Sequence, residues 1–426
     1  MIKQLLLEFR GCEMETKKQA RRIVSVDKGI ELLLLHSERQ PIENVSLAES
    51  VGRVLANDFF STFPLPSFRK AAMDGYAVTF SDIAHATPDK PVVMRVTTEV
   101  KAGSMDLPAG DHPAVRIYTG APVYEQYDTV IMQEAVVASE EEGIPFIHFP
   151  FPSERGKHVA EIGEDILEDT CILVKGTLLS AKEIVILASF GVQEIEVYRK
   201  PTVAVIPIGD ELQLPGETLR PYHLYESNGF MLEAKLKELG ANCIRYAPIP
   251  DEPACISRTI QLALNYADFI ITTGGVSVGK YDYVLDVMEE MSAEPLFTKV
   301  SMRPGAPTSA FKVQNKISFH LSGNPSACFV GFELFVKPKL LFQLGCNKYQ
   351  NDKIEANLDG DVKKPSAYPR YVRSFAEIRK GTLYVTPLSK DQSGNIAAFA
   401  NANALCLIPS GGNGAAKGQM VQMLWI

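Results

Sequence analysis

Short apolar runs alternate with amphipathic segments through the middle of the chain. Three runs predict buried strands, at residues 202–207, 243–249 and 269–273. Three segments with apolar positions at helical spacing predict helices, at 227–239, 253–266 and 283–291. A short strand at 296–300, a hairpin-like pair at 310–313 and 317–321, and a long apolar helix at 326–344 follow. Strands that alternate with helices predict a doubly wound, mostly parallel α/β domain over residues 199–345.

The flanking regions are richer in strands. Ser25, Val26 and Asp27 before an apolar run predict a capped helix at the start of an N-terminal region of two lobes, residues 23–198. Alternating segments at 92–100, 114–118, 129–132 and 144–149 make one lobe β-rich, at about 63–152. Period-two alternation at 371–378, 382–388, 404–408 and 420–425 predicts a C-terminal domain over 346–426, a small β-barrel or a sandwich. The predicted fold class is a multidomain α/β protein.

Composition narrows the classes of function. The net charge of −8 disfavours general binding to nucleic acids or anionic membranes. No apolar run reaches the ~18 residues that a membrane-spanning helix needs. The seven cysteines are scattered without a C-x-x-C pair, and the seven histidines form no close pair, which argues against a disulfide framework and a zinc site. We therefore predict a cytoplasmic protein.

Residues 1–22 are predicted to be an N-terminal extension. Their apolar stretch is interrupted by Glu8 and Arg10 and is too short for a secretory signal. Residues 1–12 do not resemble the opening of a fold, so Met14 is an alternative start.

A glycine turn follows one of the predicted strands. The run at 269–273 stops at Gly274 and Gly275 and resumes in a charged segment compatible with a helix. Such a turn lets a ligand touch the backbone, and the free N–H groups at a helix start attract anions. Residues 275–279 also match the G-x-S-x-G nucleophile elbow of hydrolases, with Ser277 as the nucleophile. His320 is the only later histidine and no H-G-G-G motif occurs, so we disfavour a serine hydrolase.

Four unusual loops fall at the carboxyl ends of predicted strands, which is the edge where doubly wound sheets bind ligands. They contain Asp210 with Glu211, Asp251, the two glycines and the segment 322–325. With Asp282, they supply three carboxylate positions near one edge. Clustered carboxylates without histidine suit Mg²⁺ that bridges a phosphate. Each acid taken alone is better explained as a helix cap, because Asp251 and Asp282 both precede predicted helices.

Two cations, Lys299 and Arg303, lie in the motif KVSMRPGAP. Magnesium, lysine and arginine together stabilise the charge that develops when a phosphoanhydride is cleaved. The residues therefore indicate chemistry on a phosphate-bearing, nucleotide-like ligand.

Seven motifs in order carry a resemblance to a known family. They are MDGYAV, YTGAPV with DTVIMQE, GEDI, GDEL, TTGGVSVGKYDY, MRPGAP and LSGNPSA. In them the chain resembles the molybdopterin molybdenumtransferases of the MoeA and gephyrin E-domain type, from about residue 23 to the C-terminus. The resemblance implies a transferase that inserts molybdate into adenylylated molybdopterin with Mg²⁺ and releases AMP. It also implies a homodimer with a MogA-like central domain, a separate molybdopterin adenylyltransferase, and molybdoenzyme acceptors or chaperones as partners.

The resemblance also assigns site residues by motif. The catalytic residues would be Asp282, Ser277, Asp74 and Asp165, and the magnesium ligands Glu211 and Asp251. The substrate-binding residues would be Thr119, Gly274, Gly275, Lys299, Arg303, Gly323, Asn324, Ser326, Arg373 and Ser393. Among these, Asp74 and Thr119 would belong to a lobe that closes over the site. Lys299 and Arg303 would bind the pterin phosphate or molybdate, and Arg373 and Ser393 would help to hold molybdate.

The chain departs from the family pattern at four places. Ser322 replaces a usual proline, Ile208 replaces a usual threonine, no arginine precedes G-E-D in 158–161, and 396–399 are IAAF where serine and leucine are usual. The departures affect the oxyanion site of the β-domain. Two alternatives therefore remain, a paralogue that inserts tungstate and a non-catalytic dimeric scaffold. The intact acids and Lys299 argue against a scaffold.

Overall fold

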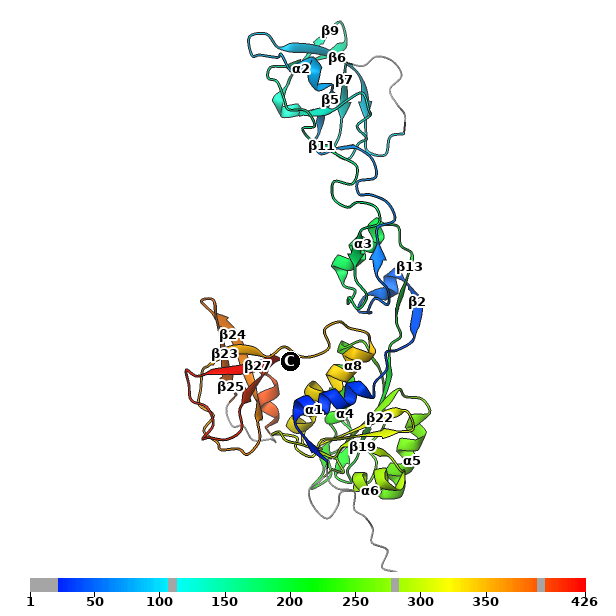
Figure 1. Ribbon diagram of the computed structural model, residues 1–426, viewed down its shortest axis with the longest axis vertical. Coiled ribbons are helices and arrows are strands. Elements are labelled where there is room, and N and C mark those ends of the chain that lie inside the picture. Colours follow the sequence, from blue (N-terminus) through cyan, green and yellow to red (C-terminus); the bar gives the residue numbers. More distant parts are fainter. Residues whose placement is uncertain (1–21, 106–112, 277–282, 389–394) are drawn as a thin grey trace, which may run out of the picture. The chain divides into compact units, whose positions relative to one another are not determined.

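The computed structural model describes residues 22–105, 113–276, 283–388 and 395–426 (Figure 1). The contacts within the chain define two compact units. Unit 1 comprises the described residues up to Ala56 together with Lys175–Ser180 and Glu194–Ile426, and unit 2 comprises Asn57–Val174 and Ala181–Gln193. No helix in the described ranges combines the length and the apolar character needed to cross a lipid bilayer.

Unit 2 is built on a six-stranded sheet of order β8-β5-β7-β6-β10-β9. Its strands are β5 Gly75–Val78, β6 Val92–Val100, β7 Ala114–Ile117, β8 Thr129–Met132, β9 Val137–Glu141 and β10 Ile144–Phe149. Two short strand pairs accompany it, β3 Phe59–Phe60 with β12 Cys171–Leu173, and β4 Lys70–Ala71 with β11 Val159–Ala160. The helices are α2 Phe80–Ile83 and α3 Ala181–Ser189. The predicted β-rich lobe is therefore present.

The central sheet of unit 1 has the order β17-β14-β18-β22-β21-β19. Four strands are parallel neighbours: β17 Asn242–Arg245, β14 Thr202–Pro207, β18 Phe269–Thr273 and β22 Lys316–Leu321. Two antiparallel strands, β21 Ser309–Val313 and β19 Glu294–Phe297, complete one side. This is the doubly wound, mostly parallel sheet that the sequence predicts.

Two predicted strands differ from the structure. The strand expected at 243–249 ends at Arg245, because the chain leaves the sheet there and returns only as a single bridge between Ile208 and Ile249. The strand expected at 296–300 is divided, because β19 pairs with β21 whereas β20 Lys299–Val300 pairs with β1 Ile23–Val24.

Helices cover both faces of the central sheet (Figure 1). α5 Pro253–Leu264 and α6 Tyr283–Glu290 pack on the face that carries Ala204 and Ile206. α1 Val26–Leu35, α4 Asn228–Glu238 and the long segment α7 Pro325–Gly331, η4 Phe332–Val336 and α8 Lys337–Gln343 pack on the face that carries Val203 and Val205. Successive residues of a strand point to opposite faces, so a strand covered on both sides is apolar throughout.

The predicted long helix at 326–344 forms with one irregular turn. The segment η4 is a turn of π-helix that ends just before α8, whose second residue is Pro338. Proline has no N–H to donate to the preceding turn, and a wider turn accommodates it.

The remaining elements of unit 1 are short. β2 Ile42–Ser46 pairs with β13 Glu194–Tyr198, and β15 Leu212–Gln213 pairs with β16 Leu224–Tyr225. Single turns of 3-10 helix occur at η2 Leu47–Ser50 and η5 Ile396–Phe399, and a further one, η3 Gln133–Ala135, lies in unit 2.

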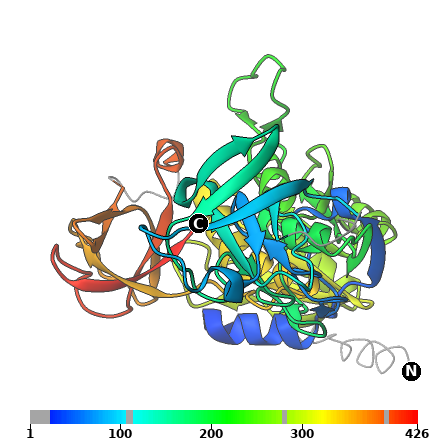
Figure 2. The ribbon, with the colours of Figure 1, turned by 90° about the horizontal axis from the view of Figure 1, so that it is seen from above.

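The C-terminal strands close into a barrel of order β23-β25-β24-β26-β27, drawn from orange to red in Figures 1 and 2. They are β23 Ile354–Leu358, β24 Arg370–Arg379, β25 Thr382–Pro387, β26 Ala404–Ile408 and β27 Met420–Trp425. The structure thus decides between the barrel and the sandwich that the pattern left open. Tyr371, Leu405 and Leu424 belong to the same apolar cluster as the central sheet, so the barrel shares a core with the α/β domain.

Candidate active site

Three loops meet at the carboxyl edge of the central sheet. β18 ends at Thr273, and Gly274 (φ 87°) and Gly275 (φ 66°) then turn the chain in the left-handed region. A Cβ on Gly274 would lie 2.2 Å from the carbonyl oxygen of Ile208, which follows β14. A Cβ on Gly323, which follows β22, would lie 3.3 Å from the Cα of Gly274. Glycine permits these approaches because it has no side chain.

Acidic side chains follow β14 and β17 at the same edge. Glu211 folds back over the turn, since a Cβ on Gly209 would lie 2.6 Å from its Oε2. Burial raises the pKa of Asp251, and the negative charges of Asp210 and Glu211 raise it further. Asp251 is therefore close enough to both carboxylates to be repelled by their charges.

A cation would relieve this repulsion. Within the described ranges, no three histidine, cysteine, aspartate or glutamate side chains form a group that could hold a metal ion by themselves. Mg²⁺ at phosphate-handling sites, however, is usually bound by one or two carboxylates together with phosphates of the substrate. Glu211 and Asp251 fit that smaller requirement.

The starts of α7 and α4 converge on Gly323. Asn324 caps α7, and its Oδ1 accepts hydrogen bonds from the N–H groups of Ser326 (3.1 Å) and Ala327 (3.4 Å). The side-chain amide of Asn228, at the start of α4, donates to the carbonyl oxygen of Gly323 (2.8 Å). Asn228 Oδ1 and Ser326 Oγ are buried polar atoms without a hydrogen-bond partner among the described residues. Such atoms favour a bound polar ligand.

The sequence does not indicate Asn228 as a site residue. Its only signal there is its place at the start of an amphipathic helix, where asparagine is an ordinary cap. Its contact with Gly323 joins segments 95 residues apart, and no local pattern predicts that contact.

The loop that carries Arg303 joins the barrel to α7. Arg303 N–H donates to the carbonyl oxygen of Pro369 (2.9 Å), and Tyr371 N–H donates to that of Arg303 (2.8 Å). Two residues later, a Cβ on Gly305 would lie 3.2 Å from the carbonyl oxygen of Ala327 in α7. The backbone of this loop thus joins the barrel at Arg303 and approaches α7 at Gly305.

Arg373 lies on β24 with its guanidinium buried. The group stacks 4.5 Å from the ring centroid of Phe399, and that ring contacts Phe329 of α7 at 5.4 Å. Burial lowers the pKa of Arg373, and its Nη1 has no hydrogen-bond partner among the described residues. A buried guanidinium with an unused donor fits an oxyanion. A neighbour that the sequence did not indicate, Arg370, has its pKa lowered by burial and by the charge of Arg303.

The departures from the family pattern have structural roles. Ile208 is buried in the apolar cluster beneath α5 and α6. Ser322 Oγ accepts a hydrogen bond from the N–H of Asn324 (3.3 Å), which steadies the turn without a proline. Phe399, in the altered 396–399 segment, supplies the ring on which Arg373 stacks.

Asp74 and Thr119 are directly hydrogen bonded within unit 2. Asp74 Oδ1 accepts hydrogen bonds from the backbone N–H (2.8 Å) and the hydroxyl (2.7 Å) of Thr119. Both bonds lower the pKa of Asp74, with a smaller contribution from the charge of Arg116. Asp74 is therefore held as a carboxylate.

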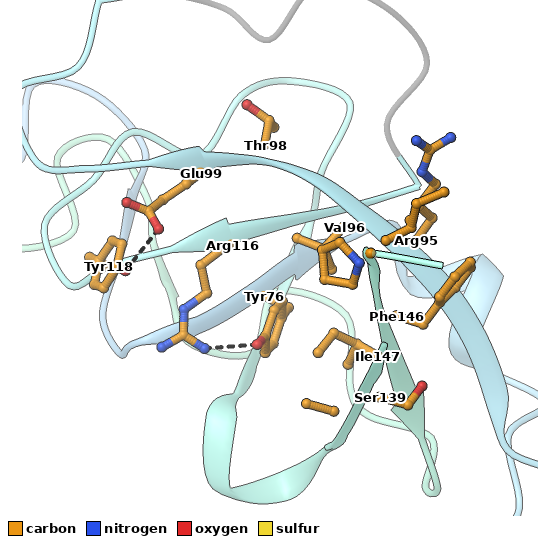
Figure 3. A pocket seen from close by; sticks show the side chains of 14 residues that line it. Tyr76, Arg95, Val96, Thr98, Glu99, Arg116, Tyr118, Ser139, Phe146 and Ile147 are labelled. Carbon is orange, nitrogen blue, oxygen red and sulfur yellow. Dashed lines mark hydrogen bonds between the residues drawn. The ribbon is translucent and has the colours of Figure 1, made fainter. Parts of the chain in front are cut away.

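A cavity of about 730 Å³ in unit 2 is lined by residues next to this pair (Figure 3). Arg116 donates a hydrogen bond to the hydroxyl of Tyr76 (2.9 Å), and its guanidinium lies 5.0 Å and 5.4 Å from the ring centroids of Tyr76 and Tyr118. The hydroxyl of Tyr118 donates to Glu99 (3.1 Å). The sequence does not indicate Arg116, because a lone arginine in a strand carries no motif.

The other predicted residues are placed as follows. Asp165 is exposed in a turn, where its N–H donates to the carbonyl oxygen of Leu65 (3.0 Å), and Lys299 lies on β20. Asp74, Thr119 and Asp165 belong to unit 2, whereas the sheet-edge residues belong to unit 1. Ser277, Asp282 and Ser393 lie outside the described residues. His320, the only later histidine for a hydrolase triad, is fully buried and contacts Thr272 (2.9 Å).

Three family models match successive parts of the chain. Residues 19–191 match the MoeA N-terminal region (domain I and II), 204–341 a probable molybdopterin binding domain, and 355–426 the MoeA C-terminal region (domain IV). A molybdopterin molybdenumtransferase of Bacillus subtilis (strain 168) is 36% identical over 409 residues, which cover 96% of this chain and 95% of the relative. The chain belongs to the molybdopterin molybdenumtransferase family. The predicted family, and with it a transferase, is confirmed.

Other proteins of this molybdopterin molybdenumtransferase family are similar to the chain over nearly its whole length. One from Staphylococcus aureus (strain MSSA476) is 34% identical over 407 residues, covering 95% of this chain and 96% of the relative. The crystal structure of a molybdopterin biosynthesis MoeA protein from Pyrococcus horikoshii OT3 superposes with a TM-score of 0.80 at 29% identity, covering 95% of this chain and 100% of that one. The predicted multidomain α/β fold is confirmed.

Proposed function

We propose that the chain inserts molybdenum from molybdate into adenylylated molybdopterin and releases AMP, in a reaction that depends on Mg²⁺. The observation that carries the proposal is the meeting of a glycine turn, paired carboxylates and buried polar atoms at one sheet edge, in a chain of this family. The turn offers backbone contact to a nucleotide-like ligand, and the carboxylates suit a metal on its phosphates.

Glu211 and Asp251 are the proposed magnesium ligands. Mg²⁺ bound to them and to the substrate phosphates would neutralise the charge that develops when the phosphoanhydride is cleaved. Glu211 is positioned by the turn after β14, and Asp251 follows the bridge between Ile208 and Ile249.

Three cations are proposed to bind the anionic parts of the substrates. Arg303 and Lys299 would contact the pterin phosphate or molybdate, and Arg373 would donate its unused Nη1 hydrogen bond to molybdate. Asn228 Oδ1 and Ser326 Oγ would hydrogen bond the ligand beside Gly323. Buried groups of this kind orient a substrate strongly, because leaving them unpaired is costly.

Asp282 and Ser277 are proposed to serve adenylate cleavage, and Asp74, Thr119, Asp165 and Ser393 stay predictions from the resemblance. The homodimer, the cytoplasmic location, the separate adenylyltransferase and the molybdoenzyme acceptors also stay predictions.

Asp282→Ala tests the assigned chemistry. Purified protein is incubated with Mg²⁺, molybdate and adenylylated molybdopterin, and released AMP is quantified. We expect Asp282→Ala to lower the rate on the order of 10²-fold or more, which is the usual effect of removing a positioned acid–base group. Glu289→Ala, which removes an exposed acid of α6, is the matched control and should leave the rate unchanged. Unchanged AMP release in Asp282→Ala would show that the assigned chemistry is wrong.

Competition between molybdate and tungstate in the same assay tests the substrate. We expect molybdate to be inserted in preference to tungstate at equal concentration. Preferential insertion of tungstate would instead support the paralogue, and failure to restore a cofactor-deficient strain together with partner binding would support the scaffold.

A further inference from the structure

A second cavity lies at the amino edge of the central sheet, where β14, β18 and β22 begin. Its volume is about 460 Å³, within the range of about 300–1,000 Å³ that is typical of small-molecule sites. The chain after α1, Arg199 ahead of β14, Asp268 directly before β18, the β21–β22 hairpin and α8 all contribute to its wall. The proposed insertion site lies at the opposite, carboxyl edge of the same strands.

Positive side chains dominate the wall of this amino-edge cavity. The cations that line it are Arg39, Arg199, Lys312, Lys316 and Lys339, and the carboxylates are Glu38 and Asp268. This excess of positive charge stands out in a chain whose net charge is −8. Salt screens exposed charges that are more than about 8 Å apart. Cations that line the cavity can therefore attract an anion even though the whole molecule is negatively charged.

The carboxylate of Asp268 is fully engaged. Its Oδ1 accepts a hydrogen bond from Arg199 (2.7 Å), and its Oδ2 accepts one from the backbone N–H of Thr202 (2.7 Å). Asp268 therefore pairs directly with Arg199, and its charge also raises the pKa of Lys339 against the larger effect of burial.

Two other cations of the wall are held in place by uncharged partners. Arg39 donates to the hydroxyl of Tyr198 (3.1 Å) and lies 5.9 Å from the ring centroid of Phe342. Lys316 Nζ donates to the carbonyl oxygen of Leu264 (2.6 Å). Neutral partners orient these side chains without cancelling their charge, so the wall is arranged before a ligand binds.

Lys339 is the least expected member of the wall. It is only 1% exposed, its Nζ donates to Gln343 Oε1 (2.6 Å), and it lies 3.3 Å from the ring centroid of Phe269. Burial lowers the pKa of Lys339 well below its usual value. A buried ammonium is costly unless an anion accompanies it, so a lysine that lines a cavity gains most from an anionic ligand.

We propose that the amino-edge cavity binds a small, multiply charged anion that carries phosphate groups. Arg39, Lys312, Lys316 and Lys339 would contact the phosphate oxygens. The cavity is larger than a single tetrahedral ion needs, which favours a phosphorylated metabolite or a condensed phosphate over inorganic phosphate. This site is separate from the insertion site.

Calorimetric titration with inorganic pyrophosphate tests the proposal. We compare the wild-type chain with a Lys312→Ala/Lys316→Ala variant and with a charge-matched Lys348→Ala/Lys363→Ala control, whose lysines are exposed outside the cavity. Loss of two cations should weaken binding about tenfold or more in the first variant, and the control should bind as the wild type does. Arg303→Ala should also keep this binding, which separates the cavity from the insertion site.

A second variant guards against misfolding. Lys339→Met replaces the buried amine by an apolar chain of similar length, and we expect weaker pyrophosphate binding with no loss of thermal stability. The absence of saturable binding in the wild type, or equal affinity in the wild type and the Lys312→Ala/Lys316→Ala variant, would overturn the proposal. AMP release should be retained in that variant, so failure of this inference leaves the insertase proposal standing.

Discussion

Asp251 carries its charge at a cost, because burial and two neighbouring carboxylates oppose its ionisation. A folded-state pKa above the unfolded value means that the native protein binds more protons than the unfolded chain between those two values. Stability therefore falls as pH rises through that window, and ionised Asp251 works against the fold at neutral pH. A residue that serves catalysis and not stability shows this behaviour.

Asp251→Asn should consequently separate stability from activity. We expect its melting temperature at pH 7 without Mg²⁺ to equal or exceed that of the wild type, because a repelled charge is removed. Mg²⁺-dependent AMP release should fall on the order of 10²-fold. Differential scanning fluorimetry and the AMP assay measure the two effects, with Glu252→Gln, an exposed neighbour, as control. A lower melting temperature with normal activity would assign Asp251 to the fold alone.

The glycine turn offers a second residue-scale prediction. Gly274→Ala combines a left-handed backbone with a Cβ placed 2.2 Å from the carbonyl oxygen of Ile208. Gly381 has a similar φ of 80° with nothing within 4 Å of a Cβ, so Gly381→Ala reports the backbone cost alone. We expect Gly381→Ala to cost about 1–2 kcal/mol in the free energy of unfolding, and Gly274→Ala clearly more. The free energies of unfolding are measured by urea denaturation. Equal losses in the two variants would show that the close approach at Gly274 does not affect stability.

At the scale of elements, α7 organises the site. Its cap, Asn324, fixes the turn after β22, its first turn meets the Arg303 loop, and Phe329 supports the ring under Arg373. The existence of this helix was predictable from its apolar run and the cap signal. Its contacts were not, because they join residues far apart in the sequence.

Substitutions of Asn324 separate its role in stability, as the cap of α7, from its proposed role in binding an anionic substrate. Asn324→Ala removes the acceptor for two N–H groups and should cost about 1 kcal/mol in the free energy of unfolding. Asn324→Asp keeps the acceptor and should retain stability. It also adds a negative charge where an anionic substrate is proposed to bind, so we expect AMP release to fall in both variants. Full activity in Asn324→Asp would argue that no anion binds at this turn.

Substitution of Arg373 tests whether an oxyanion binds between the barrel and α7. Arg373→Met removes a buried guanidinium with an unused donor, so we expect the protein without substrate to be as stable as the wild type or more stable. Molybdate binding, measured by calorimetry, should weaken about tenfold. Arg379→Met, on the same strand but paired with Glu377 and Asp359 at the surface, should leave binding unchanged. Equal affinities in all three proteins would remove Arg373 from the oxyanion site.

At the scale of the whole molecule, alternation and helical spacing were enough to predict the central sheet and four of the five barrel strands, whereas β23 was not among the predicted strands. They failed where tertiary pairing overrides local pattern, as at β17 and at the division of β19 from β20. The sheet-edge acids could be predicted from the sequence, because the carboxyl ends of parallel strands share one edge of the sheet. The sequence could not predict Asn228, Arg116 and Arg370 as site residues, because each interacts with a partner that is distant in sequence.

The most direct test of the central claim is a coupled insertion assay. The chain is incubated with adenylylated molybdopterin, Mg²⁺ and molybdate, and both the released AMP and the molybdenum cofactor delivered to a cofactor-free molybdoenzyme are quantified. We predict that AMP and cofactor appear in equal amounts, and that neither appears without Mg²⁺. AMP release without cofactor, or no reaction with every component present, would contradict the assignment of the chain as a molybdenum insertase.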